Sequence, residues 1–212
     1  EVQNGLRSNF TIPVATRQTN GTWGCKGVNN YGTPSESQLQ IDVQYGPVVD
    51  LIENKTAIEG KLFAVTCKVE SNPPPVSISW IKDNNASFSR NTTVLSISSV
   101  SRNDSGTYRC TAINQIHPSG ENEESLNGSE GFYLNVQYGA MIINLSVVGN
   151  NTVNENITAT LSCLVDSNPE SNITWTKHKL MGSLKTDVFV HQSQLIIEHA
   201  ECFDTANYTC HA

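Results

Sequence analysis

The sequence predicts an all-β protein in which one strand unit is repeated along the chain. Residues 104–110 read Asp-Ser-Gly-Thr-Tyr-Arg-Cys. The first three residues form a tight corner, and Tyr108 and Cys110 then alternate with polar residues, so both face one side of a strand. Related corners occur twice more, and each follows further alternating segments. These observations predict strands, corners and cysteines in a fixed order.

Alignment of the chain on its corner cysteines gives three copies of one pattern. Each copy has an apolar-x-Ile pair, a corner, and an aromatic residue two positions before a cysteine. The copies are Phe10-x-Ile12 with Trp23-x-Cys25, Leu95-x-Ile97 with Tyr108-x-Cys110, and Leu195-x-Ile197 with Tyr208-x-Cys210. A repeat of this detail predicts the same strands three times.

Two segments farther upstream repeat as well. Cys67 and Cys163 each lie in an alternating apolar segment that ends in Ser-Asn-Pro, which is the pattern of a half-buried strand followed by a loop. A tryptophan follows the cysteine, Trp80 after 13 residues in one copy and Trp175 after 12 in the other. The order of these marker residues is therefore Cys, Trp, Cys in both copies.

A third repeated segment lies downstream of the corners. Residues 39–43 alternate and lead into Gln-Tyr-Gly-Pro, and residues 132–136 alternate and lead into Gln-Tyr-Gly. We expect each to be a last strand followed by a short linker, and the Gly-Pro pair predicts that the first linker is stiff.

Composition argues against nucleic acid and in favour of the secretory pathway. The formal net charge is −7 and no run of Lys or Arg occurs, which argues against binding to nucleic acid or acidic membrane surfaces. The chain has 12 Asn-x-Ser/Thr acceptors, whereas its Asn, Ser and Thr content would give roughly 4 to 5 by chance. The predicted glycosylation sites are Asn9, Asn20, Asn54, Asn85, Asn91, Asn103, Asn127, Asn144, Asn150, Asn156, Asn172 and Asn207. We therefore expect an extracellular protein, in which disulfides persist.

Both ends of the chain cut through a repeat. No apolar run reaches the roughly 18 residues of a membrane helix, and the first residues lack a signal-peptide pattern. We expect a fragment of a longer chain, the ectodomain of a single-pass plasma-membrane protein, with no membrane contact by the fragment itself.

The ordered Cys, Trp and Tyr-x-Cys markers resemble the immunoglobulin superfamily, in the style of the carcinoembryonic-antigen, siglec and hemicentin-like adhesion proteins. The resemblance implies tandem immunoglobulin-like Greek-key β-sandwiches of the constant-2 or intermediate type. It also implies a tyrosine corner and disulfides that lie under the two tryptophans. The implied disulfide pairs are Cys67 with Cys110 and Cys163 with Cys210.

The same resemblance implies three segments. Residues 1–46 would contain only the last three strands of a first domain, 47–138 a complete domain, and 139–212 a domain without its last strand. The first copy has Thr19 and Trp23 in place of the corner Asp and Tyr, so we expect no phenol bond there and a looser domain. Cys25 lacks its partner, and Cys202 is expected to be a free thiol or to pair outside the fragment.

Four residues near the C-terminus have the chemistry of a zinc site, namely His199, Cys202, Cys210 and His211. Cys210 is expected in a disulfide, and His211 should point to the opposite face of the strand, so solvated histidines are favoured over a metal. No nucleophile elbow, His-Glu-x-x-His, P-loop or dinucleotide motif occurs. We expect no enzyme activity, no cofactor and no metal.

A long insertion is predicted between the last two strands of the complete domain, from about residue 114 to 131. It carries Glu121, Glu123, Glu124 and Glu130. A solvated loop is favoured over a partner contact, and calcium is the weaker alternative because such sites need six or more fixed oxygens.

Two further motifs have known roles in relatives. Ile41-Asp42-Val43 is similar to the acidic tripeptides that integrins bind, but its alternating neighbours favour an ordinary strand. Arg109 is expected to face outward, where sialic-acid-binding members of the superfamily use an arginine. Those members use it in a variable-type domain, so the role is not carried over.

The resemblance implies a non-catalytic adhesion or recognition ectodomain. Its expected partners are cell-surface or matrix proteins or glycans, including a second copy of the chain, and no nucleic acid. A structural matrix protein of many immunoglobulin modules and the ligand-binding ectodomain of a receptor kinase are the alternatives. Residues 47–138 are both complete and faithful to the pattern, so we expect the binding surface there.

Overall fold

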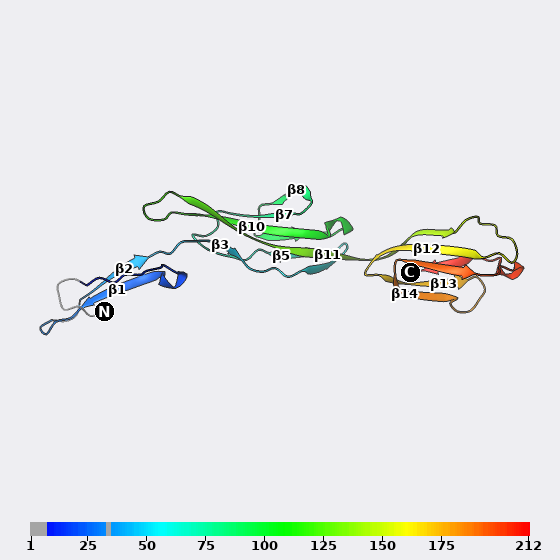
Figure 1. Cartoon of the computed structure of the whole chain (residues 1–212), viewed down its shortest axis with the longest axis horizontal. Coiled ribbons are helices and arrows are strands. Elements are labelled where there is room, and N and C mark those ends of the chain that lie inside the picture. The colour runs from blue at the N-terminus through cyan, green and yellow to red at the C-terminus, as the bar shows by residue number, and fades with distance from the viewer. Residues whose placement is uncertain (1–7, 33–34) are drawn as a thin grey trace. The chain divides into compact units, whose positions relative to one another are not determined.

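The computed structural model describes residues 8–32 and 35–212, which form an all-β structure, as predicted (Figure 1). Residues 1–7 and 33–34, within the first predicted segment, lie outside the described residues. Contacts divide the chain into two compact units. Unit 1 is drawn from Glu1–Glu53, Val65–Leu95 and Thr107–Phe132, and unit 2 from Asn54–Ala64, Ser96–Gly106 and Tyr133–Ala212.

Unit 1 contains antiparallel strands. Its strands are β1 (Gly21–Gly27), β2 (Ser35–Ile41), β3 (Tyr45–Val49), β6 (Val69–Asn72), β7 (Ser77–Lys82), β8 (Asn85–Arg90) and most of β10 (Gly106–Ile116). β1 pairs with β2 and β3 with β6, whereas β7 lies between β8 and β10. β5 (Phe63–Thr66) and β9 (Val94–Ile97) form a further pair, and each contributes residues to both units.

Unit 2 is organised around the second half of β11 (Glu124–Val147). The other strands are β4 (Lys55–Ile58), β12 (Ala159–Asn168), β13 (Ser171–Lys177), β14 (Lys185–Val190), β15 (Gln192–Ile197) and β16 (Tyr208–His211). β11 pairs in parallel with β4 and then antiparallel with β12, which also pairs with β15. In a second sheet, β13 lies between β14 and β16. None of the helical segments in the described part of the chain is long and apolar enough to span a membrane.

Two disulfide-centred cores hold the strands. Cys67 is bonded to Cys110, and Cys163 is bonded to Cys210, which are the pairs that the resemblance implies. The Cys67–Cys110 core comprises Cys67, Trp80, Leu95, Tyr108, Cys110 and Phe132, and the Cys163–Cys210 core comprises Cys163, Val165, Ile173, Trp175 and Cys210. Both tryptophans are completely buried. Alternation places these residues on the inner faces of their strands.

The first difference from the sequence prediction lies at Phe10-x-Ile12, which does not form a strand. A strand needs a neighbour for its backbone hydrogen bonds, and among the described residues none pairs with this segment. Phe10 instead stacks on Trp23, with ring centroids 5.6 Å apart.

The predicted insertion between residues 114 and 131 is mostly a hairpin. β10 continues to Ile116 and β11 begins at Glu124, so only residues 117–123 form the loop. The buried Asn114 amide donates hydrogen bonds to the backbone oxygens of Tyr45, at 2.9 Å, and Pro73, at 3.0 Å. A Cβ at Gly128 would lie 2.1 Å from the Pro47 backbone oxygen. The pairing is therefore extended because the hairpin packs on residues 45–47.

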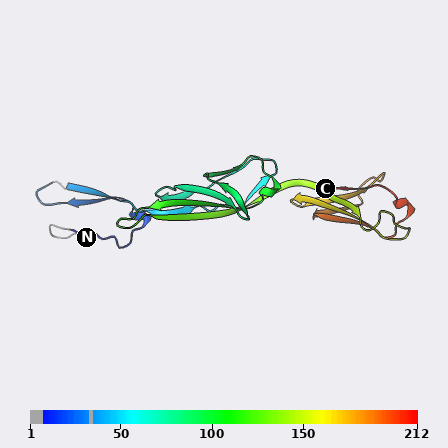
Figure 2. The same ribbon diagram turned by 90° about the horizontal axis from the view of Figure 1, so that it is seen from above.

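Tyr138 and Gly139, which were expected to form a linker, lie within a strand and not in a loop. β11 passes through both residues and changes its partner from β4 to β12, and its ribbon is continuous in Figure 2. The register shifts between Tyr138 and Met141, which marks the change of partner. Backbone pairing is therefore maintained where the sequence pattern predicted a break.

Candidate interaction surfaces

Three short 3-10 turns form the strand corners. They are η1 (Arg17–Thr19), η2 (Arg102–Asp104) and η3 (Cys202–Asp204). In each turn, the side chain of the last residue accepts a hydrogen bond from the backbone N–H of the residue before the turn. The distances are 3.0 Å from Thr16 to Thr19, 2.7 Å from Ser101 to Asp104, and 3.1 Å from Glu201 to Asp204. Thr19 therefore makes the capping contact of the corner aspartate.

Aromatic side chains connect two of these corners to the strands that follow. The Tyr208 hydroxyl donates to the backbone oxygen of Asp204 at 3.0 Å, as a tyrosine corner requires. The Trp23 indole N–H donates to the backbone oxygen of Thr19 at 2.9 Å, across the same four-residue offset. The corner that was expected to lack this bond therefore has it, because an indole replaces the phenol.

All 12 predicted glycosylation asparagines are exposed. Three of them also support the backbone: the side-chain oxygens of Asn20, Asn54 and Asn172 accept the N–H groups of Val43, Tyr133 and Phe189. An N-glycan is attached to the amide nitrogen, which these bonds do not use. The fold leaves every acceptor sterically open, and glycosylation itself stays a prediction.

One outward-facing strand surface, which is partly exposed, carries no acceptor. This β7–β10 face consists of Ser79, Ile81, Arg109 and Thr111, whose neighbours Trp80 and Cys110 point into the core. Arg109 lies opposite Ile81 in the register, and Thr111 lies opposite Ser79.

The central residues of the β7–β10 face are available to solvent. Ile81 is 43% exposed, and the Arg109 guanidinium lies 3.7 Å from the Asp83 carboxylate. The corresponding face of unit 2, formed by β13 and β16, carries the acceptor Asn172 on β13, and Asn207 directly precedes β16. Sequence reasoning identified Arg109 as outward-facing but missed Ile81, which strand parity would have found.

The four acidic residues of the predicted insertion do not converge. Glu121 and Glu123 lie in the hairpin loop, and Glu124 and Glu130 lie on β11. The nearest basic group to Glu123 is His117, whose Nδ1 atom lies 4.0 Å from the carboxylate. No group of three or more His, Cys, Asp or Glu side chains in the described ranges is arranged to hold a metal ion.

The four residues near the C-terminus that have the chemistry of a zinc site do not come together either. Cys210 is bonded to Cys163, and His211 points to Thr176, with 3.2 Å between Nε2 and Oγ1. Cys202 is an exposed free thiol, as is Cys25.

Asp42 is hydrogen-bonded within the fold rather than presented on a loop tip. It directly follows β2, and its carboxylate accepts the Asn72 amide at 2.7 Å and the Gln44 amide at 3.1 Å. These bonds, that of Asn72 first, hold the pKa of Asp42 below its ordinary value. The carboxylate of the integrin-like tripeptide is therefore hydrogen-bonded to side chains of this chain.

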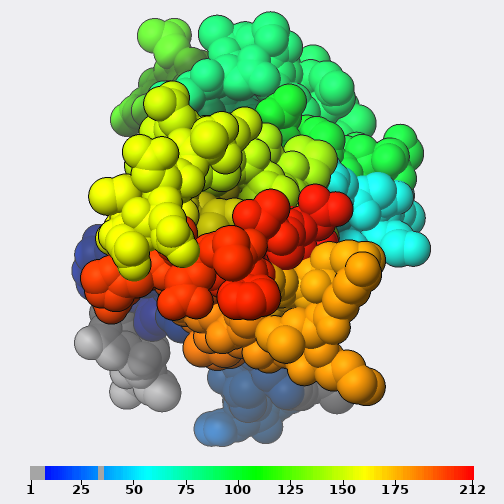
Figure 3. Space-filling model, turned by 90° about the vertical axis from the view of Figure 1, so that its right-hand side faces the viewer, coloured from blue at the N-terminus to red at the C-terminus, as the bar shows by residue number. Residues whose placement is uncertain are grey.

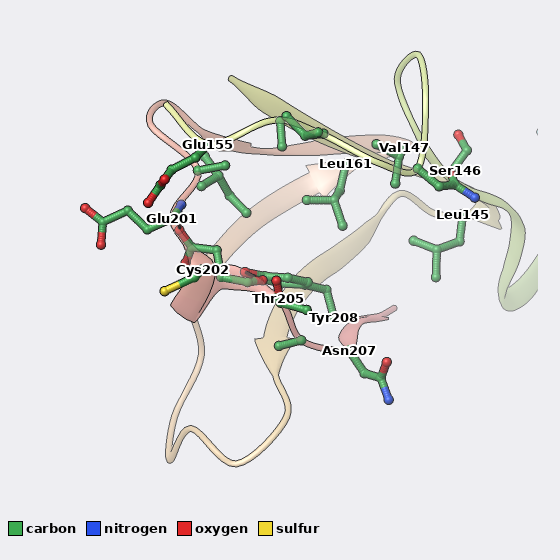
Figure 4. Close-up of a pocket in the computed structure, with 17 residues that line it drawn as sticks. Leu145, Ser146, Val147, Glu155, Leu161, Glu201, Cys202, Thr205, Asn207 and Tyr208 are labelled. Atoms are coloured by element: carbon green, nitrogen blue, oxygen red, sulfur yellow. Dashed lines mark hydrogen bonds between the residues drawn. The ribbon is translucent and has the colours of Figure 1, made fainter. Parts of the chain in front are cut away.

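A groove of about 690 Å³ opens beside the Cys163–Cys210 core (Figure 4). Leu145 and Leu161 reach into the space over the Tyr208 ring, whereas the Asn207 amide points away from it. The last residues of the chain, red in Figure 3, lie at the surface between the yellow and orange segments of unit 2. Tyr108, the counterpart of Tyr208, is covered by Phe132, with ring centroids 5.7 Å apart. The groove is therefore an uncovered side of the core.

Comparison with known proteins identifies the repeated unit. The family model for the immunoglobulin domain matches residues 47–114 and 144–212. Human hemicentin-1 is 30% identical over 212 residues, which cover 94% of this chain and 4% of hemicentin-1. Human myelin-associated glycoprotein is 28% identical over 202 residues, which cover 93% of this chain and 30% of that protein. The chain thus spans a minor part of the length of either relative.

A solved structure shares the fold. The crystal structure of Dpr2 Ig1-Ig2 in complex with DIP-Theta Ig1-Ig3 aligns with a TM-score of 0.57 and 20% identity, over 92% of this chain and 69% of that one. Two matched segments, each with a disulfide and a buried tryptophan, agree with this likeness. The chain therefore belongs to the immunoglobulin superfamily.

Proposed function

We propose that this chain is part of an extracellular adhesion or recognition ectodomain that binds protein or glycan partners through its immunoglobulin modules and catalyses no reaction. The observation that carries the proposal is the β7–β10 face, an outward-facing and partly exposed strand surface without a glycosylation acceptor in a chain that has 12. Two similarities support it. One relative is a glycoprotein by name, and the similar solved structure is a complex of immunoglobulin-domain proteins.

The chemistry of the β7–β10 face suits a protein contact. Ile81 provides an apolar centre, Arg109 a charged group with several donors, and Ser79 and Thr111 a polar rim. Protein interfaces combine an apolar centre with a polar rim and are enriched in arginine.

The domain organisation is part of the same proposal. We propose the segments 1–46, 47–138 and 139–212, and the family matches at 47–114 and 144–212 support the second and third. We further propose occupied glycosylation sites and a place outside the plasma membrane, in agreement with the exposure of all 12 acceptors.

A single substitution tests the face. Arg109→Asn creates an Asn-Cys-Thr acceptor on β10 and places a glycan there, whereas Arg109→Gln removes the charge without adding one. Beads coated with the parent chain should aggregate or bind cell surfaces, and the glycosylated Arg109→Asn chain should lose this binding. The Arg109→Gln chain should retain most of it, and glycosidase treatment should restore the Arg109→Asn chain.

Two results would overturn the proposal. Absence of both bead aggregation and cell binding, with the parent chain correctly folded by circular dichroism, would contradict an adhesion role. Unchanged binding by a chain that carries the added glycan would exclude the β7–β10 face.

A structural matrix protein is the second candidate, because similarity to hemicentin-1 extends over 94% of the chain. Beads that bind deposited matrix after the cells have been removed, but do not bind the cells, would favour this candidate. The same preparation of beads serves both measurements.

A further inference from the structure

Two side-chain clusters of matching composition lie where the repeated Gln-Tyr-Gly segments occur. The Tyr45 cluster consists of Arg17, Asp42, Tyr45, Glu70 and Asn72, and the Tyr138 cluster consists of Arg102, Asn135, Tyr138, Asp166 and Asn168. All contacts of the first lie within unit 1, and all contacts of the second lie within unit 2. Each cluster can therefore be described by itself.

In the Tyr138 cluster, a guanidinium is held by an aromatic ring and two acids. The Arg102 Cζ atom lies 4.0 Å from the centroid of the Tyr138 ring. Arg102 forms an ion pair with Asp166, and its Nε donates to Glu59 at 3.1 Å. The Tyr138 hydroxyl donates to the other Asp166 oxygen at 2.9 Å. Cation–π and charge-assisted contacts thus act together on one arginine.

Protonation favours these contacts at neutral pH. The hydrogen bond to Glu59 raises the pKa of Arg102, and the hydrogen bond to Asp166 raises the pKa of Tyr138. Both groups therefore keep the protons that they donate.

An asparagine adds a second contact between the same segments. The Asn168 amide nitrogen donates to the Asn135 side-chain oxygen at 2.7 Å and to the Val136 backbone oxygen at 2.6 Å. Asn168 is the last residue of β12, whereas Asn135 and Val136 lie on β11 just before Tyr138. The end of β12 is thus tied to β11 beside Tyr138.

The Tyr45 cluster repeats this arrangement. The Arg17 Cζ atom lies 4.0 Å from the Tyr45 ring centroid, and its Nη1 lies 3.9 Å from a Glu70 oxygen. The Asn72 amide nitrogen donates to Asp42 at 2.7 Å and to the Val43 backbone oxygen at 2.9 Å. In both places, Arg stacks on Tyr, an acid lies beside the Arg, and Asn is hydrogen-bonded to the segment just before the Tyr.

The sequence offsets show that the two clusters are equivalent. Arg17 and Arg102 are each the first residue of a 3-10 turn. Glu70 and Asp166 each lie three residues after the first cysteine of a family-matched segment. The asparagines each lie five residues after that cysteine. Matching residues at matching positions therefore meet in the same way twice.

We propose that these clusters are module-docking contacts. In each, an Arg of one immunoglobulin module, stacked on a Tyr, binds the acid of the next module, and the Asn of that next module binds the segment before the Tyr, so that the joint between the two modules is fixed. The partner of the acid and Asn surface is thus a preceding module with Arg at the first position of its turn. η3 has Cys202 at that position, so the third copy does not present the guanidinium. This joint-fixing role does not depend on which partner the β7–β10 face binds.

The two joints differ in strength. Arg102, Glu59 and Asp166 have side chains only 32%, 37% and 34% exposed, and three groups share the guanidinium. Arg17 and Glu70 are 50% and 72% exposed and farther apart. Exposed, isolated pairs contribute little, whereas shielded networks contribute more. The Tyr138 cluster is therefore the one to test.

Distances between spin labels in the full 212-residue chain test the proposal. Cys202 takes one label and Ala86→Cys the other, with Cys25→Ser to prevent a third, because all three positions are exposed. The parent should give one narrow distance distribution. Arg102→Gln should broaden it, with the undocked population rising about 5- to 30-fold, the factor that corresponds to 1–2 kcal/mol. Lys185→Gln is the matched control, because it also removes a cation from an ion pair, at Asp187 within β14.

A second variant separates a joint contact from general destabilisation. Asp166→Asn should broaden the distribution in the same way, and adding Arg102→Gln should broaden it little further, because both substitutions remove one network. Tyr138→Phe removes a single hydrogen bond and should have a smaller effect. Each variant should keep the parent melting transition of both cores. An unchanged distribution in Arg102→Gln and in Asp166→Asn, or a broadening equalled by Lys185→Gln, would overturn the proposal.

Discussion

The Cys67–Cys110 core and the Cys163–Cys210 core share a disulfide and a buried tryptophan but are stabilised differently. In the first, the Phe132 ring stacks on Tyr108 with centroids 5.7 Å apart and meets the edge of Trp80 at 6.0 Å. Tyr108 is completely buried as a result. The Trp80 indole N–H, however, has no hydrogen-bond partner among residues 8–32 and 35–212.

The second core reverses this arrangement. The Trp175 indole N–H donates to Ser193 at 2.8 Å, and the Ser193 hydroxyl donates to Asp187 at 2.6 Å. No aromatic ring among the described residues covers Tyr208, which faces the open groove. One core therefore depends on aromatic packing and leaves a donor unsatisfied, whereas the other satisfies its donor and leaves packing incomplete. The same marker residues thus predict the fold without predicting what stabilises each copy.

Removal of the aromatic cover should have the largest effect. Phe132→Ala should destabilise the Cys67–Cys110 core by about 3–5 kcal/mol, because it creates a cavity beside Trp80 and Tyr108. Chemical denaturation followed by tryptophan fluorescence measures the change. Tyr133→Ala is the matched control, since that neighbouring ring is 46% exposed. A loss below about 1 kcal/mol in Phe132→Ala would contradict the importance of the stack.

Removal of the polar link should have a moderate effect on the other core. Ser193→Ala should cost about 1–3 kcal/mol, because it leaves the buried Trp175 N–H without an acceptor. Thr93→Ala, at the corresponding but exposed position of the first core, should change the stability by less than about 0.5 kcal/mol. Because it also removes the Asn91 acceptor, both variants are compared in chains without N-glycans. If both substitutions shifted the denaturation midpoint equally, the hydrogen bond between Trp175 and Ser193 would not contribute measurably to the stability of the core.

The acid stability of the two cores should also differ. The backbone N–H of Glu201 and then Lys177 lower the pKa of Asp204, and Lys185 and then Ser193 lower the pKa of Asp187. A carboxylate whose folded pKa lies below its ordinary value, here 3.8, stabilises the fold above that value. This stabilisation is lost as the pH falls through the lower folded pKa.

Denaturation of the Cys163–Cys210 core between pH 6 and pH 2, about the range over which carboxylates titrate, measures this contribution. Its stability should decline below the ordinary carboxyl pKa, and Asp204→Asn should flatten the decline. Asp50→Asn, at an exposed position of unit 1, is the control. An unaltered pH profile in Asp204→Asn would show that the corner carboxylate does not link protonation to folding.

Short-range patterns explain why much of the fold was predictable. Alternation around Cys67, Trp80 and Cys110 identified buried positions, because side chains of a strand alternate between its faces. The hairpin beyond Ile116 was not predictable, because its strands are held by Asn114 and Gly128 against residues 45–47, far away in sequence. Contacts between distant segments leave no local pattern.

The candidate surfaces show the same limit. Strand parity predicted that Arg109 points outward. That Ile81 lies beside it could be seen only from the register of β7 and β10. The Tyr138 cluster joins Arg102 and Asp166 across 64 residues, and neither residue has an unusual neighbourhood. Its sequence signals were the repeated Gln-Tyr-Gly segment and the repeated offset of the acid and Asn from Cys163, matched at Cys67.

The smallest effect is expected where the third corner departs from the second. Cys202 occupies the position of Arg102, and its thiol is exposed and unbonded. Cys202→Ser should therefore change the stability of the Cys163–Cys210 core by less than about 0.5 kcal/mol, because it removes no buried contact. Denaturation under non-reducing conditions checks this, with Cys25→Ser as the matched control for the other exposed thiol. A loss comparable to that of Ser193→Ala would mean that the Cys202 thiol makes a stabilising contact in solution, and η3 would then need a structural role of its own.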